Sequence, residues 1–494
     1  MIPRRLALFL PILCAAGCLV GPAYRRPSVP IPPAYQEPSP AGAAGAVTWK
    51  AAQPADAARR APWWEVFRDS DLNALLEKVN VSNQTVALAE AQYRSARAAV
   101  IGIRSALFPT VGVSGQVAPS SGLSTMSPGP GQAAPTVTTY EIAVDLGWEI
   151  DLFGRIRRSV EAGVAGALAT AADLESVRLA MQAEAAADYF LLRGQDAAIH
   201  LLQKTAAGYQ SELDLTENRY RQGVASGIDV SQAKTQLEST LAQVADLQIT
   251  RAQFDHALAV LSGLAPQEFT VAAGELGAAL PEIPAGLPSE LLERRPDIAA
   301  AERRVAAANA QIGVAVAGFF PTLSLTGLAG YESSALAGLF TLPNRIWSLG
   351  ASLADTIFGG GKHRAAYEQA RAAYDGSVAQ YRETVLEAME QVEDNLAALR
   401  LLGEEARHQA VAVTEAERTV TLAKNRYLNG ISSYFEVVTA QNTALSNERV
   451  AVGLLARQLT ASVNLIKALG GGWRSPDPAT SAASPVTAVS AVRK

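Results

Sequence analysis

The sequence contains little cysteine and little histidine. Its 494 residues include two cysteines, Cys14 and Cys18, which both lie close to the N-terminus, so no disulfide framework can form within the chain. The four histidines fall in predicted helices or at a helix start, without the spacing of metal ligands. No Ser-His-Asp arrangement is evident either. We therefore expect no disulfide-stapled fold, no metal site, no cofactor and no enzyme.

Clusters of basic residues and long apolar helices are also missing. The net charge is −5, and lysine and arginine do not gather in one stretch, which argues against a nucleic-acid partner. The weakly apolar run 305–325 is interrupted by Asn309, Gln311 and Pro321. We expect a helix followed by a strand there, rather than a transmembrane helix.

A glycine-rich stretch, 358–363, superficially resembles a phosphate-binding loop. It lacks the G-x-x-x-x-G-K-[ST] spacing that such loops need. Phe358-Gly359 also matches Phe153-Gly154 earlier in the chain, between a predicted strand and a predicted helix. We therefore interpret 358–363 as a strand-to-helix turn.

The most informative feature that is present is an internal repeat. Phe108-Pro109-Thr110 returns as Phe320-Pro321-Thr322, and Asn218-Arg219-Tyr220 with Gly223 returns as Asn425-Arg426-Tyr427 with Gly430. The copies lie about 207 residues apart, and this spacing drifts only around the Pro-containing motifs; the repeat indicates two homologous structural halves.

Each half shows the same predicted elements. The first has a helix over 70–104, a strand over 111–117, a strongly alternating strand over 140–152, a helix over 155–222 and a returning helix that ends at Leu261. The second has a helix from Pro296, strands over 322–326 and 347–354, and a helix over 362–429. No proline occurs from Thr136 to Ala265, which permits a helix on the order of 100 Å long.

Apolar residues recur every seven positions in the long helices of the second half. The returning helix carries Ile431, Val438, Leu445, Val452, Leu459 and Ile466 at this period, and the outgoing helix carries Val378, Val385, Val392 and Leu399. This repeat predicts that the helices pair as antiparallel coiled coils.

The strands imply an assembly of several chains. The strand over 140–152 could cross a bilayer or lie half-buried in a sandwich, because both give the same alternation. Four strands per chain cannot close a barrel, and an open sheet edge is not tolerated in lipid. Membrane insertion would therefore require several chains, and three would supply twelve strands.

The N-terminus is typical of an exported protein. Arg4 and Arg5 precede an apolar run that ends before Cys18, which predicts a signal peptide. The arrangement resembles a bacterial lipoprotein signal, with Cys18 as the lipidated first residue. An ordinary signal peptide with an incidental cysteine is the alternative.

Together these motifs resemble the TolC-type outer-membrane factor family, and within it the NodT-type efflux lipoproteins. The start of the predicted mature chain, Cys18-Leu-Val-Gly-Pro-Ala-Tyr-Arg-Arg-Pro27, is similar to that branch, as are Trp63-Trp64 and Arg294-Arg295-Pro296-Asp297. The resemblance covers nearly all of the chain from Met1 to Trp473.

The resemblance implies a fold and a function. The fold is that of an internally duplicated α+β membrane protein. A long α-helical coiled-coil barrel continues into a transmembrane β-barrel. The three chains of a homotrimer share this β-barrel, and each chain contributes four strands. The function is the outer-membrane channel of a tripartite efflux pump, which passes drugs or other small molecules out of the cell. The partners are a periplasmic adaptor (membrane fusion) protein and an inner-membrane transporter of the RND type. The chain would lie in the outer membrane, held by the lipid on Cys18, and extend into the periplasm.

The resemblance also implies roles for particular residues. The turns at the far end of the long helices would contact the adaptor; they comprise Gly223, Val224, Ala225, Ser226, Gly227, Gly430, Ile431, Ser432 and Ser433. Gate positions of the family fall on Tyr427, Phe435 and Thr439, and Thr439 replaces the usual acid. Phe435 could instead be a core residue of the coiled coil. Glu436 and Asp229 are the nearest acids, and the sequence leaves open whether either faces the lumen.

The expected organisation runs from a signal peptide (1–17) and a lipidated extended segment (18–62) to a first repeat (63–265). A connecting segment (266–288), a second repeat (289–473) and a disordered tail (474–494) follow. Two other functions remain open: the exit duct of a type I protein secretion system, and a non-conducting periplasmic coiled-coil scaffold lipoprotein.

Overall fold

The computed structural model describes residues 19–37, 62–121, 136–277, 280, 281, 283 and 291–471. The signal peptide, Cys18 and the C-terminal tail lie outside the described residues. The chain forms two compact units, each assembled from three separate segments. The first unit comprises Met1–Ser28, Tyr93–Thr170 and Ala301–Tyr381, and the second comprises Val29–Gln92, Ala171–Ala300 and Arg382–Lys494.

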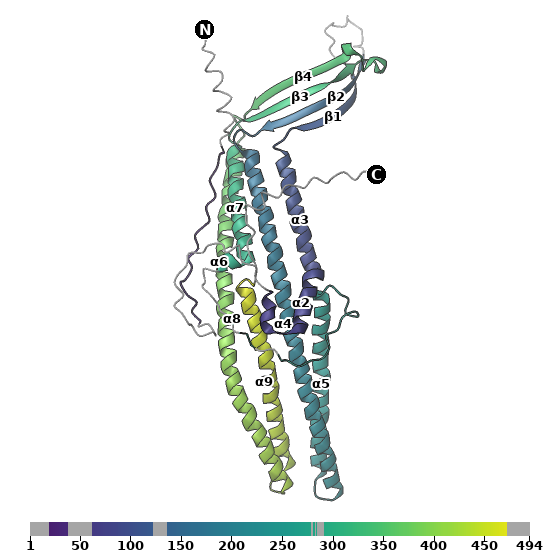
Figure 1. Ribbon diagram of the computed structural model, residues 1–494, viewed down its shortest axis with the longest axis vertical. Helices are drawn as coiled ribbons and strands as arrows, with labels where there is room; N and C mark the ends of the chain where they lie inside the picture. Colours follow the sequence, from purple (N-terminus) through teal and green to yellow (C-terminus); the bar gives the residue numbers. More distant parts are fainter. Residues whose placement is uncertain are drawn as a thin grey trace. The chain divides into compact units, whose positions relative to one another are not determined.

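The order of elements confirms the duplication (Figure 1). The first half contains η1 (Trp63–Phe67), α2 (Ser70–Ser82), α3 (Gln84–Ser105), β1 (Thr110–Ser121), β2 (Thr136–Ile150), α4 (Arg155–Arg221) and α5 (Gly227–Leu261). The second half contains α6 (Leu291–Arg294), α7 (Pro296–Ala317), β3 (Thr322–Ser333), η3 (Leu336–Gly338), η4 (Leu342–Asn344), β4 (Arg345–Ala354), α8 (Lys362–Leu428) and α9 (Tyr434–Ala468). Helices α4 and α8 both have 67 residues, and α5 and α9 both have 35.

The first predicted helix differs from the structure, because 70–104 forms two helices that meet at Asn83. The backbone of Asn83 is extended (φ −65°, ψ 124°). Its side-chain oxygen accepts hydrogen bonds from the backbone N–H groups of Thr85 and Val86, at 2.9 and 3.0 Å. Its side-chain nitrogen donates to the carbonyl oxygen of Leu261 at 2.8 Å. Asn83 therefore caps α3 and fixes the break against the end of α5.

The four strands form one antiparallel sheet in the order β1-β2-β3-β4, within the first unit. Neighbours along one row of the sheet are Val113, Val144, Ala329 and Trp347. Neighbours along an adjacent row are Gly112, Asp145, Leu328 and Ser348. Because adjacent rows point to opposite faces, one face is apolar and the other is mostly small or polar. Strands β1 and β4 each pair with only one strand among the described residues.

Phenylalanines mark the junctions between this sheet and the helices. Phe153 and Phe320, which occupy different junctions, stack with ring centroids 4.7 Å apart. The glycine-rich stretch before α8 contains Gly360 and Gly361 at positive φ, which fits the predicted strand-to-helix turn. The run 305–325 contains the end of α7 and the start of β3, as predicted. Among the helices of the described residues, none is both long and apolar enough to cross a lipid bilayer.

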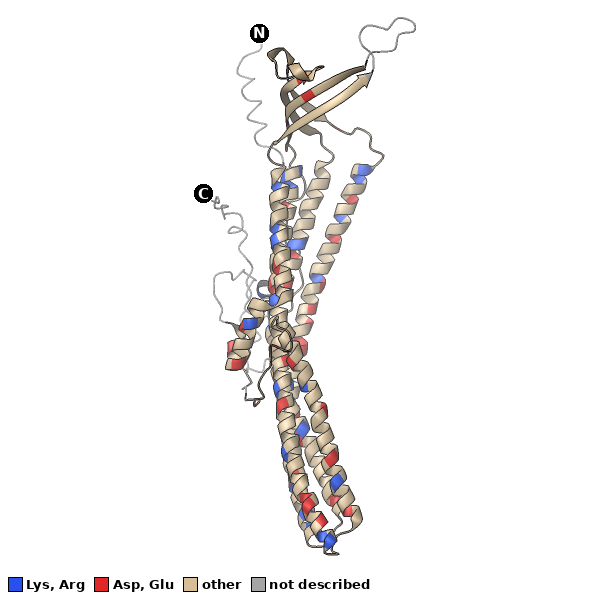
Figure 2. Cartoon of the chain, turned by 90° about the vertical axis from the view of Figure 1, so that its right-hand side faces the viewer, with Lys and Arg blue, Asp and Glu red and all other residues tan. Residues whose placement is uncertain are grey.

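Helices α4 and α8 begin in the first unit and continue into the second, where α4 forms a hairpin with α5 and α8 forms a hairpin with α9 (Figure 1). The predicted apolar repeat is largely buried: Val385, Val392 and Leu459 are fully covered. Ile431 is the exception, because α9 begins only at Tyr434 and Ile431 lies exposed in the preceding turn. Acidic and basic side chains are interspersed along the long helices (Figure 2).

Candidate functional site

The two helix turns have the same geometry, which explains the repeated Asn-Arg-Tyr-x-x-Gly motif. Gly223 has φ +77° and Gly430 has φ +75°. The N–H of Gly223 donates to the carbonyl oxygen of Tyr220 at 2.9 Å, and that of Gly430 donates to Tyr427 at 3.0 Å. The next N–H in each turn reaches the arginine carbonyl at 2.9 Å. This is the Schellman end of a helix, in which a left-handed residue, here glycine, closes the last turn.

The returning helices begin differently in the two halves. Ser226 and Asp229 form a reciprocal capping box at the start of α5, with hydrogen bonds of 2.9 and 3.2 Å. Ser433 makes no side-chain capping bond. Glu436, in the first turn of α9, forms an ion pair with Arg426 at 3.6 Å. Both acids near the predicted gate therefore have a partner within the chain.

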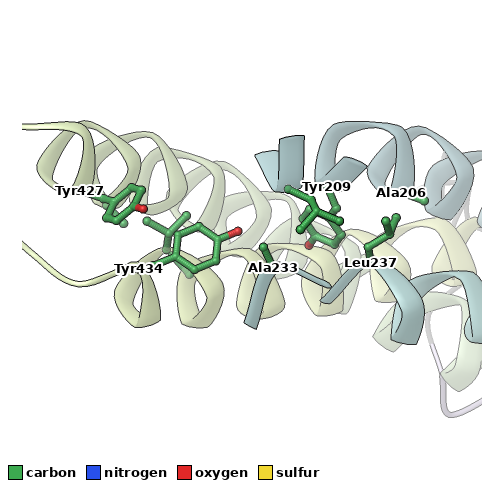
Figure 3. Packing of buried hydrophobic residues seen from close by; sticks show 10 residues of the cluster. Ala206, Tyr209, Ala233, Leu237, Tyr427 and Tyr434 are labelled. Carbon is green, nitrogen blue, oxygen red and sulfur yellow. The ribbon is translucent and has the colours of Figure 1, made fainter. Parts of the chain in front are cut away.

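Just above the turns, all four long helices share one buried cluster, which we call the tip core (Figure 3). It consists of Ala206, Tyr209 and Leu213 from α4, Ala233 and Leu237 from α5, Ala423 and Tyr427 from α8, and Tyr434, Val437 and Ala440 from α9. The rings of Tyr427 and Tyr434 lie 5.2 Å apart, and the guanidinium of Arg219 lies 4.9 Å above the Tyr427 ring. The tip core thus joins the two hairpins.

Burial in the tip core raises the pKa of two tyrosine hydroxyl groups. For Tyr434, burial is the main cause, and the nearby charge of Glu212 raises the pKa further. Burial also raises the pKa of Tyr427, with Asp229 contributing. Both tyrosines therefore stay neutral at physiological pH and act as packing groups with a polar end.

The structure separates the three residues predicted for the gate. Tyr427 belongs to the tip core and is 9% exposed, whereas Phe435 is 63% exposed. Thr439 is exposed, and its hydroxyl donates to the carbonyl oxygen of Phe435 at 2.8 Å. Phe435 and Thr439 together line a groove of about 380 Å³ beside α8. Within one chain, Phe435 is therefore not a core residue of the hairpin.

The predicted adaptor-contact residues are accessible. All nine are exposed or half-buried, and Val224 and Ile431 present apolar side chains to solvent. Ile228, just beyond the first turn, is similarly exposed and was missed by the sequence analysis. Its place directly after the glycine turn is the signal that could have identified it.

Sequence analysis also missed a group of acids between the hairpins. Glu212, Glu417 and Glu448 line one small cavity, although each resembles an ordinary surface acid of a long helix. Only the packing of α4 against α8 and α9 brings them together. Within the described residues, no three or more histidine, cysteine or acidic side chains are arranged to hold a metal ion.

Comparison with known proteins identifies the family. The sequence model of the family "Outer membrane efflux protein" matches residues 75–264 and 287–471. The chain is 33% identical over 473 residues to the "Probable efflux pump outer membrane protein TtgC" of Pseudomonas putida, covering 95% of each chain. It is 34% identical to the "Solvent efflux pump outer membrane protein SrpC" of Pseudomonas putida, covering 94% of this chain and 97% of SrpC.

A solved structure agrees with these sequence matches. The outer-membrane channel OprN superimposes with a TM-score of 0.82 and is 31% identical. The match covers 92% of this chain and 100% of OprN. TtgC and SrpC are named as efflux pump outer membrane proteins, and OprN is named as an outer-membrane channel. The chain therefore belongs to the outer membrane efflux protein family.

Proposed function

We propose that this chain is the outer-membrane exit duct of a tripartite efflux pump. It would passively release small molecules that an inner-membrane transporter delivers through a periplasmic adaptor. Family membership supports the efflux role, and TtgC and SrpC are both named as the outer-membrane proteins of efflux pumps. An RND-type transporter is the proposed inner-membrane partner.

The main structural support for this proposal is the four-stranded sheet formed by β1 to β4. It has one apolar face, on which Val113, Trp347 and Leu349 are exposed. It also has two edges without a partner strand among the described residues. Unpaired edges are costly in lipid, where no water can satisfy the backbone. Three chains pairing β1 with β4 would remove every edge and give twelve strands, enough for a lumen. A periplasmic scaffold would not need such a sheet.

The described start of the chain supports a lipid anchor on Cys18, which would be the only covalent group. Leu19 packs against Gly154, and the backbone N–H of Val20 donates to the carbonyl oxygen of Phe153 at 3.3 Å. The buried guanidinium of Arg158 donates to the carbonyl oxygens of Val20 and Gly21, at 3.0 and 3.2 Å. This docking fixes Leu19 and Val20, the first described residues, beside the end of β2.

Mass spectrometry of the mature N-terminus tests the anchor. We expect a diacylated or triacylated Cys18, because several acyl chains at about 0.8 kcal/mol per buried methylene bind a membrane firmly. A mature chain that begins at another, unmodified residue would contradict it.

Conductance in planar lipid bilayers tests the duct. Purified full-length protein should form channels, and cysteines placed on the outer edges of β1 and β4 should cross-link neighbouring chains into trimers. Cysteines placed in β2 and β3, which are already paired within the chain, are the matched control and should not link chains. A stable monomer that still conducts would refute the shared barrel, and a trimer without conductance would favour the scaffold. Passage of unfolded protein instead of small molecules would favour a secretion duct.

A further inference from the structure

The first described residues of the chain contact two helices from different repeats. We call residues 19–24 the docking segment; it forms no helix or strand and lies in the first unit. Its hydrogen bonds reach α4, which belongs to the first repeat, and α7, which belongs to the second. The bonded residues are separated by 137 to 287 positions in the sequence, so the docking segment can bind only after both repeats have folded.

Side chains of both helices bind three successive carbonyl groups of the docking segment. The guanidinium of Arg158, on α4, donates to the carbonyl oxygens of Val20 and Gly21, at 3.0 and 3.2 Å. The amide of Asn309, on α7, donates to the carbonyl oxygen of Pro22 at 3.1 Å. Arg158 is 4% exposed and Asn309 is 5% exposed. Two buried donors are thus committed to the backbone of a segment that lies outside their own helices.

Glycine is required where the docking segment approaches α7 most closely. Gly21 has φ +95°, and a Cβ on it would lie 2.5 Å from the Cα of Gly313. Gly313 is buried, and a Cβ on it would lie 2.8 Å from the side chain of Arg158. Neither position has room for a larger residue while the segment is docked.

Tyr24 ends the docking segment with a hydrogen bond to a buried carboxylate. Its hydroxyl donates to Glu302 on α7, which is 8% exposed. The guanidinium of Arg303 lies 3.5 Å from the other carboxylate oxygen. Burial, then the bond to Glu302, raises the pKa of Tyr24, so the hydroxyl keeps its proton and remains a donor. A buried carboxylate is costly without donors, so the loss of Tyr24 would leave Glu302 poorly satisfied.

The internal repeat offers a comparison with a helix that lacks such a site. Helix α3 is the counterpart of α7, at the spacing of 212 residues that separates Phe108 from Phe320. At that spacing, Glu302, Asn309 and Gly313 correspond to Glu90, Arg97 and Ile101. All three residues of α3 are exposed. The amide donor and the glycine that receive the docking segment are therefore particular to α7 and do not recur in its counterpart.

We propose that α4 and α7 form a binding site for the start of this same chain, and that its occupation joins the two repeats at the base of the sheet. The backbone N–H of Val20 donates to the carbonyl oxygen of Phe153 at 3.3 Å, and Phe153 stacks on Phe320. Phe153 follows β2 and Phe320 precedes β3, so the docked segment supports the junction from which both central strands leave. Release of the segment removes these contacts and loosens that junction. The inference depends on neither lipidation nor conductance.

Hydrogen–deuterium exchange of the full-length protein in detergent tests the site. Tyr24→Phe removes the hydroxyl and keeps the ring. We expect exchange at the Val20 amide and in segments 153–160 and 300–320 to rise by about tenfold to a hundredfold, the range for losing a hydrogen bond to a charged group. The control is Arg25→Gln, which changes the next residue, an exposed one, and should exchange as the wild type does.

A double-mutant comparison tests the Tyr24–Glu302 contact itself. Tyr24→Phe should have a smaller effect in a Glu302→Gln background than in the wild type, because the two changes act on one hydrogen bond. In a Glu90→Gln background, which alters the exposed counterpart on α3, Tyr24→Phe should keep its full effect. An equal effect of Tyr24→Phe in all three backgrounds would overturn the assigned contact.

Gly21→Ala keeps the proposal testable if the substitutions at Glu302 impair folding. It should release the docking segment by steric conflict with Gly313 and raise exchange in the same segments as Tyr24→Phe. If both variants raise exchange at Val20 alone and leave segments 153–160 and 300–320 as protected as in the wild type, the docking segment is a passive tether and the proposal is wrong. No step requires channel activity, so failure here is distinguishable from failure of the proposed duct.

Discussion

Adjacent residues at the start of α9 should respond in opposite ways to truncation. Tyr434 is 3% exposed and packs in the tip core, whereas Phe435 is 63% exposed. If Phe435 lines the constriction of the assembled duct, Phe435→Ala should widen that constriction without weakening the hairpin. Tyr434→Ala should do the reverse. The two variants differ by one position on the same helix, so each is the control for the other.

The expected magnitudes follow from burial. A buried aromatic side chain removes roughly 150–250 Å² from water, which at about 25 cal/mol per Å² gives roughly 4–6 kcal/mol. Truncating a core aromatic residue typically costs about 3–5 kcal/mol, so Tyr434→Ala should destabilise the tips by about this amount. An exposed substitution usually changes stability by less than about 0.5 kcal/mol, which is the expectation for Phe435→Ala.

Single-channel conductance and hydrogen exchange of the tips separate the two effects. Three symmetry-related Phe435 rings would form a dry constriction that blocks ions by dewetting, so Phe435→Ala should raise conductance at unchanged tip protection. Tyr434→Ala should reduce protection in α8 and α9. The reasoning is refuted if Phe435→Ala unfolds the tips and leaves the conductance of the surviving trimers unchanged. Phe435 would then pack as a core residue between chains, and the gate would lie elsewhere.

Three further changes test other parts of the structure. Thr439→Asp should introduce block by divalent cations in bilayer recordings, because three new carboxylates would meet where the parent has uncharged hydroxyls. Gly330→Ala should reduce the yield of assembled trimer, because an added Cβ would lie 2.2 Å from the Ile142 carbonyl oxygen. Gly327→Ala, whose nearest neighbour would lie at 3.6 Å, should assemble normally. Asn83→Ala should lower the free energy of unfolding by about 1–2 kcal/mol in denaturant titrations, because the α3 cap and the bond to α5 are lost.

Features with a local cause were predicted closely from the sequence. Helix α4 was expected over 155–222 and spans Arg155–Arg221, because a long run free of proline ends at a glycine turn. Strand β2 was expected from its alternation of apolar with small or acidic residues, and it pairs on both sides. The period, the stop signals and the repeat all lie within the chain itself.

Features that depend on packing were not predictable. Nothing in the helical run 70–104 marks Asn83 as a break, because its capping role requires α5 to lie beside it. Likewise, Tyr220 and Tyr427 occupy the same place in the repeated motif, yet Tyr220 is 53% exposed and Tyr427 is 9% exposed. Only the docking of the two hairpins decides which tyrosine is covered.

The duplication nevertheless reaches beyond the helices and strands. Arg193 on α4 and Arg400 on α8 lie 207 residues apart, which is the repeat spacing. Arg193 donates to the Ala272 carbonyl oxygen at 2.6 Å, in the extended segment after α5. Arg400 donates to Glu37 at 2.8 Å, in the extended segment near the N-terminus. Equivalent arginines thus each fasten an extended segment to a long helix, although the segments come from unrelated parts of the sequence. A guanidinium can bind either a carbonyl or a carboxylate, because it offers several donors in a rigid plane. The same helix position could therefore keep its anchoring role while the anchored segments diverged.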